Sequence, residues 1–108
     1  IHVRAIVGRF LEHTRVYYFE HGGAKKLYCA SADWMGRNLF SRVETCFPIL
    51  DEKIKQRIVE DGLLSYLHDN QNAWELQANG EWQKAAVVEQ ARVHNAQMYL
   101  VEQKQLNV

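Results

Sequence analysis

The sequence has few cysteines, one proline, no excess charge of either sign and no long apolar run. The spacing of Cys29 and Cys46 fits neither a metal site nor a disulfide framework, so we expect two buried thiols in a reducing compartment. Thirteen basic and thirteen acidic side chains give a net charge of zero, which excludes a polybasic nucleic-acid-binding protein and makes any anion site local. No apolar run approaches the roughly 20 residues of a membrane span, and no signal peptide is visible.

The composition is typical of a folded domain. Hydrophobic residues make up 47% and charged residues 24% of 108 residues, which is enough for one domain with a modest core. We therefore expect residues 1–108 to form a single domain. The chain begins at Ile1, directly in a strand-like segment, which suggests a piece of a longer protein.

Hydrophobic periodicity predicts strands and helices in mixed order. The predicted strands cover residues 2–7, 15–20, 26–29, 42–49, 73–77 and 81–84. Glycine-containing turns join the second strand to the third and the fifth to the sixth, so each of these pairs forms a hairpin. The pattern indicates a mixed α/β (α+β) fold, in which helices pack on one sheet.

Two helices are predicted, over 51–68 and 87–106. Asp51 is a good N-cap for the first helix. Gly62 costs that helix about 1 kcal/mol relative to alanine and predicts a kink or a break there. Residues 30–38 are predicted to form a surface loop or a single helical turn.

The chemically most informative stretch is 8–20. His13 and Arg15 are two residues apart and would project from the same side of an extended chain, and Arg9 precedes them. A titratable nitrogen beside permanent cations suits the binding of phosphoryl groups. The alternative for His13 is a hydrogen-bonded structural histidine at the surface.

A second group of candidates follows the first hairpin and consists of Ser31, Asp33, Asn38 and Arg42. Each has a structural alternative. Ser31 and Asn38 are residue types that cap loops, and Asp33 would serve as the N-cap of the turn after it. Arg42 would pair with Glu44 on the outer face of a strand. The spacing of the histidines does not predict a metal site.

Several blocks together resemble the C-terminal domain of family-1 polyphosphate kinase. They are Arg-Phe-Leu-Glu-His-Thr-Arg-Val-Tyr-Tyr-Phe at 9–19, Ser-Ala-Asp-Trp-Met-Gly-Arg-Asn at 31–38, Arg-Val-Glu at 42–44 and Pro-Ile-Leu-Asp at 48–51. The resemblance covers nearly the whole chain through Leu67 and the rest more loosely. It implies a phospholipase D-like half domain, the later part of the second C-terminal domain of such an enzyme.

The resemblance implies a cytoplasmic enzyme that reversibly transfers the terminal phosphate of ATP to inorganic polyphosphate. It implies Mg²⁺, bound mainly by residues outside this chain, and no nucleic acid as partner. The histidine that is phosphorylated lies in a preceding domain of the same enzyme, so the isolated piece is expected to be inactive. The parent enzyme is expected to be a homo-oligomer.

The resemblance also implies roles for individual residues. His13 falls on a histidine that contacts the nucleotide phosphates and assists the transfer, which makes it the catalytic candidate. Arg42 falls on an arginine that lines the phosphate tunnel, and Arg9 and Arg15 fall on basic positions that bind ATP and phosphate. The support residues for this site are Ser31, Asp33 and Asn38.

Two other functions stay open at this stage. One is a scaffold or oligomerisation module whose basic loop only binds polyanions. The other is a stand-alone phosphodiesterase dimer, because the phospholipase D superfamily pairs two His-x-Lys motifs. Here His13 is followed by Arg15 in place of that lysine, which argues against the phosphodiesterase.

Overall fold

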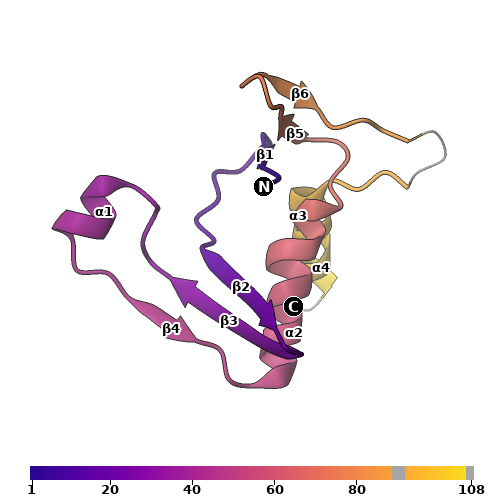
Figure 1. The fold of residues 1–108 in the computed structure, drawn as a ribbon. Coiled ribbons are helices and arrows are strands. Elements are labelled where there is room, and N and C mark those ends of the chain that lie inside the picture. Colours follow the sequence, from indigo (N-terminus) through magenta and orange to yellow (C-terminus); the bar gives the residue numbers. More distant parts are fainter. Residues whose placement is uncertain (89–91, 107–108) are drawn as a thin grey trace. The chain divides into compact units, whose positions relative to one another are not determined.

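A computed structural model describes residues 1–88 and 92–106 (Figure 1). The chain divides into two compact units. Unit 1 comprises Ile1–Glu12 and Leu64–Val108, and unit 2 comprises His13–Leu63. The expectation of a single domain stays a prediction, and each unit is described here by itself.

The strands form two three-stranded sheets, so the prediction of one sheet is wrong. Unit 1 contains β1 (Arg4–Ile6), β5 (Ala73–Leu76) and β6 (Trp82–Lys84), in the order β1-β5-β6. Unit 2 contains β2 (Val16–His21), β3 (Ala24–Ala30) and β4 (Cys46–Pro48), in the order β2-β3-β4. All pairings are antiparallel. Periodicity identifies a strand, but its hydrogen-bonding partner depends on contacts distant in sequence.

The β2–β3 hairpin is the centre of unit 2. Its register runs from Val16 opposite Cys29 to His21 opposite Ala24. The turn residues Gly22 and Gly23 have φ angles of 53° and 82°, a conformation that a two-residue hairpin turn requires and that glycine adopts without strain. Leu27 on β3 is only 1% exposed and is the large apolar side chain that is fully buried in this unit.

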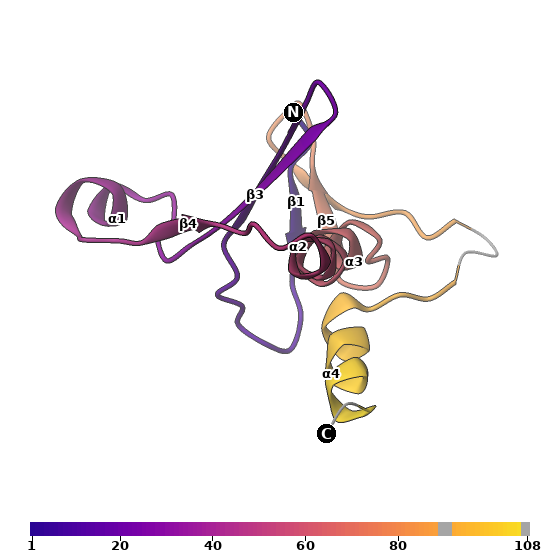
Figure 2. The ribbon, with the colours of Figure 1, turned by 90° about the horizontal axis from the view of Figure 1, so that it is seen from below.

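The segment between β3 and β4 contains a short helix, α1 (Gly36–Ser41), where a loop or helical turn was predicted. It lies at the end of the sheet opposite the β2–β3 turn (Figures 1 and 2). The N-cap residue is Met35, without a side-chain capping bond, so the predicted capping role of Asp33 is wrong. The strand predicted over 42–49 is shorter than expected because α1 ends at Ser41, Arg42 is its C-cap, and β4 begins only at Cys46.

The predicted helix over 51–68 is confirmed with an irregular centre. It consists of α2 (Glu52–Val59), a π-helical turn (Glu60–Leu64) and α3 (Ser65–Leu67). Asp51 is the N-cap, and its carboxylate accepts a hydrogen bond from the Ile54 amide at 3.0 Å. The break expected at Gly62 is the π-helical turn. A Cβ at Gly62 would meet Val16 at 3.7 Å, so the helix packs closely against β2.

The second hairpin, β5–β6, is confirmed, and Gly80 in its turn has a φ angle of 87°. The helix predicted over 87–106 is α4 (Ala96–Leu106), which begins later than expected. Residues 87–88 and 92–95 are irregular, and residues 89–91 of this prediction lie outside the described residues. The Asp69 carboxylate accepts a hydrogen bond from the Ala96 amide at 2.8 Å, which satisfies a free amide at the start of the helix. In the described part of the chain, no helix has the length and apolar character needed to cross a lipid bilayer.

Candidate functional site

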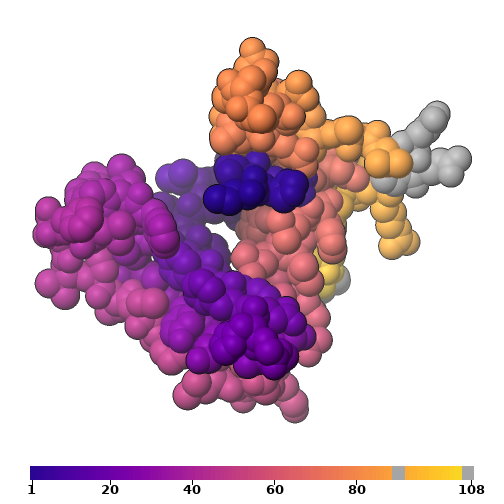
Figure 3. Space-filling model, viewed as in Figure 1, coloured from indigo at the N-terminus to yellow at the C-terminus, as the bar shows by residue number. Residues whose placement is uncertain are grey.

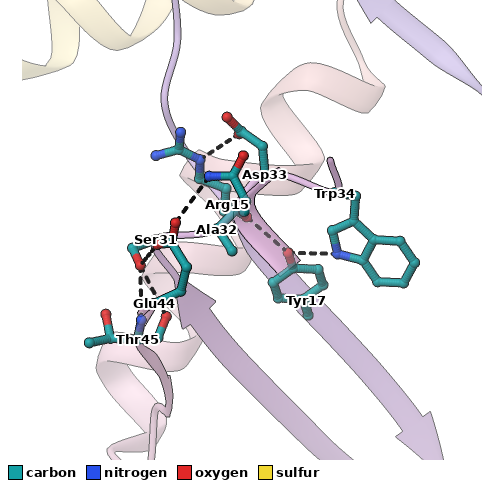
Figure 4. Close-up of polar contacts among 9 residues, drawn as sticks. Arg15, Tyr17, Ser31, Ala32, Asp33, Trp34, Glu44 and Thr45 are labelled. Carbon is teal, nitrogen blue, oxygen red and sulfur yellow. Dashed lines mark hydrogen bonds and ion pairs between the residues drawn. The ribbon is translucent and has the colours of Figure 1, made fainter. Parts of the chain in front are cut away.

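An arginine–aspartate pair lies at the start of β2. Arg15 directly precedes this strand, and its Nε donates a hydrogen bond to Asp33 Oδ1 at 2.9 Å (Figure 4). The pair lowers the pKa of Asp33, first through this hydrogen bond, and the charges of Arg37 and His13 act in the same direction. The pKa of Arg15 is raised by the same bond. Because the bond uses Nε, the terminal amino groups of Arg15 remain for another anion.

A second polar cluster surrounds Glu44. Its carboxylate accepts hydrogen bonds from the Ser31 hydroxyl and, at 3.0 Å, from Asn38 Nδ2. The Ser31 hydroxyl also accepts from the Thr45 amide at 2.9 Å (Figure 4). These contacts lower the pKa of Glu44, with the Ser31 bond as the largest cause. Ser31 and Asn38 therefore bind a side-chain carboxylate, and Ser31 also caps the loop, because its hydroxyl bonds the backbone of Thr45.

Arg42 borders a hollow in unit 2. The hollow has a volume of about 600 Å³ and lies over aromatic side chains of the sheet. Trp34 and Tyr17 stand at its wall, where Trp34 Nε1 donates to the Tyr17 hydroxyl at 2.8 Å (Figure 4). Asn38 and Glu44 also line it, so apolar walls meet a charged rim. The space-filling view shows the magenta α1 segment, which carries part of this lining, at the surface (Figure 3).

Arg42 and Glu44 interact through their charges, and the hydrogen-bond partners of Glu44 are other residues. The charge of Arg42 helps to lower the pKa of Glu44, but the hydrogen bonds to this carboxylate come from Ser31 and Asn38. Glu44 is therefore a residue of the cluster that sequence reasoning treated only as a surface partner of Arg42. Glu44 lies two residues after Arg42 in a segment predicted as a strand. Residues two apart on a strand face the same side, so this spacing was the signal that Glu44 lies near Arg42.

The predicted site residues fall in different units. His13, Arg15 and Arg42 belong to unit 2, together with the support residues. His13 is exposed, and it is close enough to Asp33 for its charge to affect the pKa of that carboxyl group. Arg9 belongs to unit 1, where its guanidinium lies 5.6 Å from the centre of the Phe10 ring.

The carboxylates of the site offer little to a metal ion. Within residues 1–88 and 92–106, no three side chains of histidine, cysteine, aspartate or glutamate form a group that could hold one. Asp33 is paired with Arg15, and Glu44 accepts from two side chains. Both carboxylates are therefore already engaged by other side chains.

We expect the Asp33 pair to make unit 2 less stable in acid. The pKa of Asp33 is lowered from its ordinary value of 3.8, so the unfolded state binds protons more readily than the folded state. The stabilisation is present above the ordinary pKa and is lost as the pH falls through the lowered value. Asp33→Asn should therefore flatten the acid part of a plot of urea midpoint against pH, measured by tryptophan fluorescence.

Arg15→Ala is the matched test of the cause, because it removes the main interaction that lowers the pKa of Asp33. It should flatten the same part of the curve. An acid dependence that is identical in the wild type and in both variants would contradict the assignment.

Comparison with known proteins gives one consistent answer. The family model for polyphosphate kinase C-terminal domain 2 matches residues 1–97. The chain is 53% identical over 102 residues to a polyphosphate kinase of Pseudomonas aeruginosa, and the match covers 94% of this chain and 15% of that protein. A polyphosphate kinase of Burkholderia cenocepacia is 50% identical over 101 residues, covering 94% of this chain and 14% of the relative.

A solved structure agrees with these relatives. The crystal structure of polyphosphate kinase from Porphyromonas gingivalis matches with a TM-score of 0.84 and 29% sequence identity, over 99% of this chain and 17% of that chain. The chain thus spans about one seventh of the length of the curated relatives that it matches.

Proposed function

Because the chain belongs to the polyphosphate kinase C-terminal domain 2 family, we propose that it supplies part of the phosphoryl-transfer site of a polyphosphate kinase. The parent enzyme would move the terminal phosphate of ATP to inorganic polyphosphate and back. The observation that best supports this proposal is the Arg15–Asp33 pair, in which Nε is held at 2.9 Å and the terminal amino groups are left for a phosphate. His13 and Arg42, in the same unit, would complete the chain's contribution.

The chemistry required of these residues is positioning and charge stabilisation. In phosphoryl transfer, negative charge spreads over the oxygens of the transferred group, and guanidinium groups stabilise it. Arg15 and Arg42 would bind those oxygens. His13 would hydrogen-bond the leaving oxygen or give it a proton as the bond to the transferred phosphorus breaks.

The nucleophile would come from outside this chain. In the first half-reaction a histidine nitrogen of a preceding domain would attack the terminal phosphorus of ATP and release ADP. The end of a polyphosphate chain would then attack the phosphohistidine and grow by one unit. Mg²⁺ would be held mainly by other parts of the enzyme. ATP, ADP and polyphosphate are its substrates, and a cytoplasmic location and a homo-oligomer remain part of the proposal.

The test compares the isolated chain with a chimera. In the chimera, the chain replaces the 102 matching residues of the Pseudomonas aeruginosa enzyme. We expect the chimera to form ATP from ADP and polyphosphate, and the isolated chain to form none because it lacks the nucleophile. Activity of the isolated chain would refute the half-site, and an inactive but folded chimera would refute the assignment of function.

A further inference from the structure

Glu44 has no part in the transfer chemistry proposed above, yet it joins both ends of the segment 31–38. At one end the Ser31 hydroxyl donates a hydrogen bond to its carboxylate. At the other end Asn38 Nδ2 donates to Glu44 Oε1 at 3.0 Å. One carboxylate therefore closes a loop of eight residues.

The contact with Asn38 is made to a buried amide. Asn38 is only 4% exposed, and its Oδ1 has no hydrogen-bond partner among the residues that the structure describes. The bond from Nδ2 to Glu44 is thus the polar contact that orients this side chain. A buried amide that lost this acceptor would leave a donor unsatisfied, which disfavours the observed position of α1.

The loop closed by Glu44 carries the anion partner of Arg15. Asp33 lies two residues after Ser31, and its carboxylate accepts from Arg15 Nε at 2.9 Å. A bond through Nε restrains the guanidinium and hence the direction of its terminal amino groups. The direction in which Arg15 points therefore depends on where the loop places Asp33.

The second arginine of the site, Arg42, is close to Glu44 in the sequence. Arg42 is the C-cap of α1, two residues before Glu44, and it lines the hollow together with Glu44. The charges of Arg42 and Arg15 both act on Glu44, so the carboxylate lies within the field of the two guanidinium groups.

We propose that Glu44 is a positioning residue of the phosphate site: by holding Ser31 and Asn38 it fixes the loop whose Asp33 directs Arg15. This inference rests on the proposed function. In this role Glu44 need not touch the nucleotide or polyphosphate. It acts by presenting Arg15 and Arg42 in a fixed arrangement before the substrate arrives, which is how preorganised groups stabilise developing charge.

Glu44→Gln in the chimera tests the proposal. Glutamine has one oxygen acceptor, so it can serve Ser31 or Asn38 but not both as well as the carboxylate does. We expect the KM for polyphosphate to rise about tenfold, with a smaller change in kcat, because the arginines that bind phosphate lose their arrangement. Calorimetric binding of polyphosphate to the chimera should weaken by a similar factor.

Glu60→Gln is the matched control. Glu60 is an exposed carboxylate of unit 2 that also accepts a hydrogen bond from a side-chain amide, that of Gln56 at 3.0 Å. This variant should keep the wild-type KM. Ser31→Ala removes one donor and leaves the carboxylate in place, so it should raise the KM in the same direction as Glu44→Gln.

The outcomes separate this inference from the proposed function. An active chimera whose KM is unchanged by Glu44→Gln would overturn the positioning role alone, as would a lower melting temperature with unchanged KM. A wild-type chimera that folds but transfers no phosphate would overturn the proposed function. If Glu44→Gln fails to fold, Ser31→Ala decides: a raised KM supports the proposal and an unchanged KM refutes it.

Discussion

Replacing His13 by alanine in the chimera is expected to lower ATP formation from ADP and polyphosphate by a factor of about 10² or more. This is the scale of a lost acid–base or charge-stabilising group in a transfer step. His13 is exposed in unit 2, and its charge reaches the carboxylate that holds Arg15. The loss should fall on kcat, because in the proposed mechanism the imidazole would act in the transition state, on the oxygen that joins ADP to the transferred phosphorus, more than on the bound substrate. The measurement is a steady-state assay with saturating polyphosphate.

His21→Ala is the matched control for this prediction. His21 is an exposed histidine at the end of β2, and it belongs to the same unit as His13. We expect its replacement to leave the rate within about twofold, the range of an ordinary surface substitution. If His13→Ala were as active as His21→Ala, His13 would be a surface histidine and the arginines would remain as the candidates. If polyphosphate binding weakened steeply with salt and was the same in the wild type and in His13→Ala, a polyanion-binding module would then be favoured.

Asp69→Ala is expected to cost unit 1 about 3 kcal/mol or more in free energy of unfolding. Asp69 is 1% exposed, and its carboxylate accepts from the amides of Gln71 at 2.9 Å, Asn72 at 2.7 Å and Ala96 at 2.8 Å. Alanine would leave three backbone donors without this acceptor, and each buried unsatisfied donor costs about 1–3 kcal/mol. Urea unfolding of the chain, followed by circular dichroism, measures the loss.

Asp51→Ala provides the comparison for Asp69. Asp51 is an exposed N-cap with one side-chain bond, to the Ile54 amide, and its replacement should cost about 1 kcal/mol. Asp69→Asn should fall between the two alanine variants, because it keeps one oxygen acceptor. A cost for Asp69→Ala no larger than that for Asp51→Ala would contradict the view that this carboxylate organises the turn at 69–72 and the start of α4.

The sequence predicted most elements of the fold because their signals are local. The β2–β3 hairpin follows from alternating aromatic residues and a glycine pair, and α2 follows from the Asp51 cap and its apolar spacing. The start of α4 was misplaced, since periodicity continues into residues before Ala96. The irregular part before it is held by Asn70, whose side chain bonds the Arg92 carbonyl at 2.7 Å and the His94 amide at 2.8 Å. The sequence around Asn70 does not predict that its side chain bonds residues more than 20 positions away.

The sequence by itself determined the hairpins, the main helix and, through specific blocks of residues, the family. Those features depend on backbone preferences and on the order of side chains over a few neighbouring residues, so the local sequence is enough to predict them. Only the tertiary structure decided that the strands form two sheets, that Asp33 holds Arg15 rather than capping α1, and that Glu44 gathers Ser31 and Asn38. These are choices among partners far apart in sequence, and a carboxylate binds whichever donors the fold brings within about 3 Å.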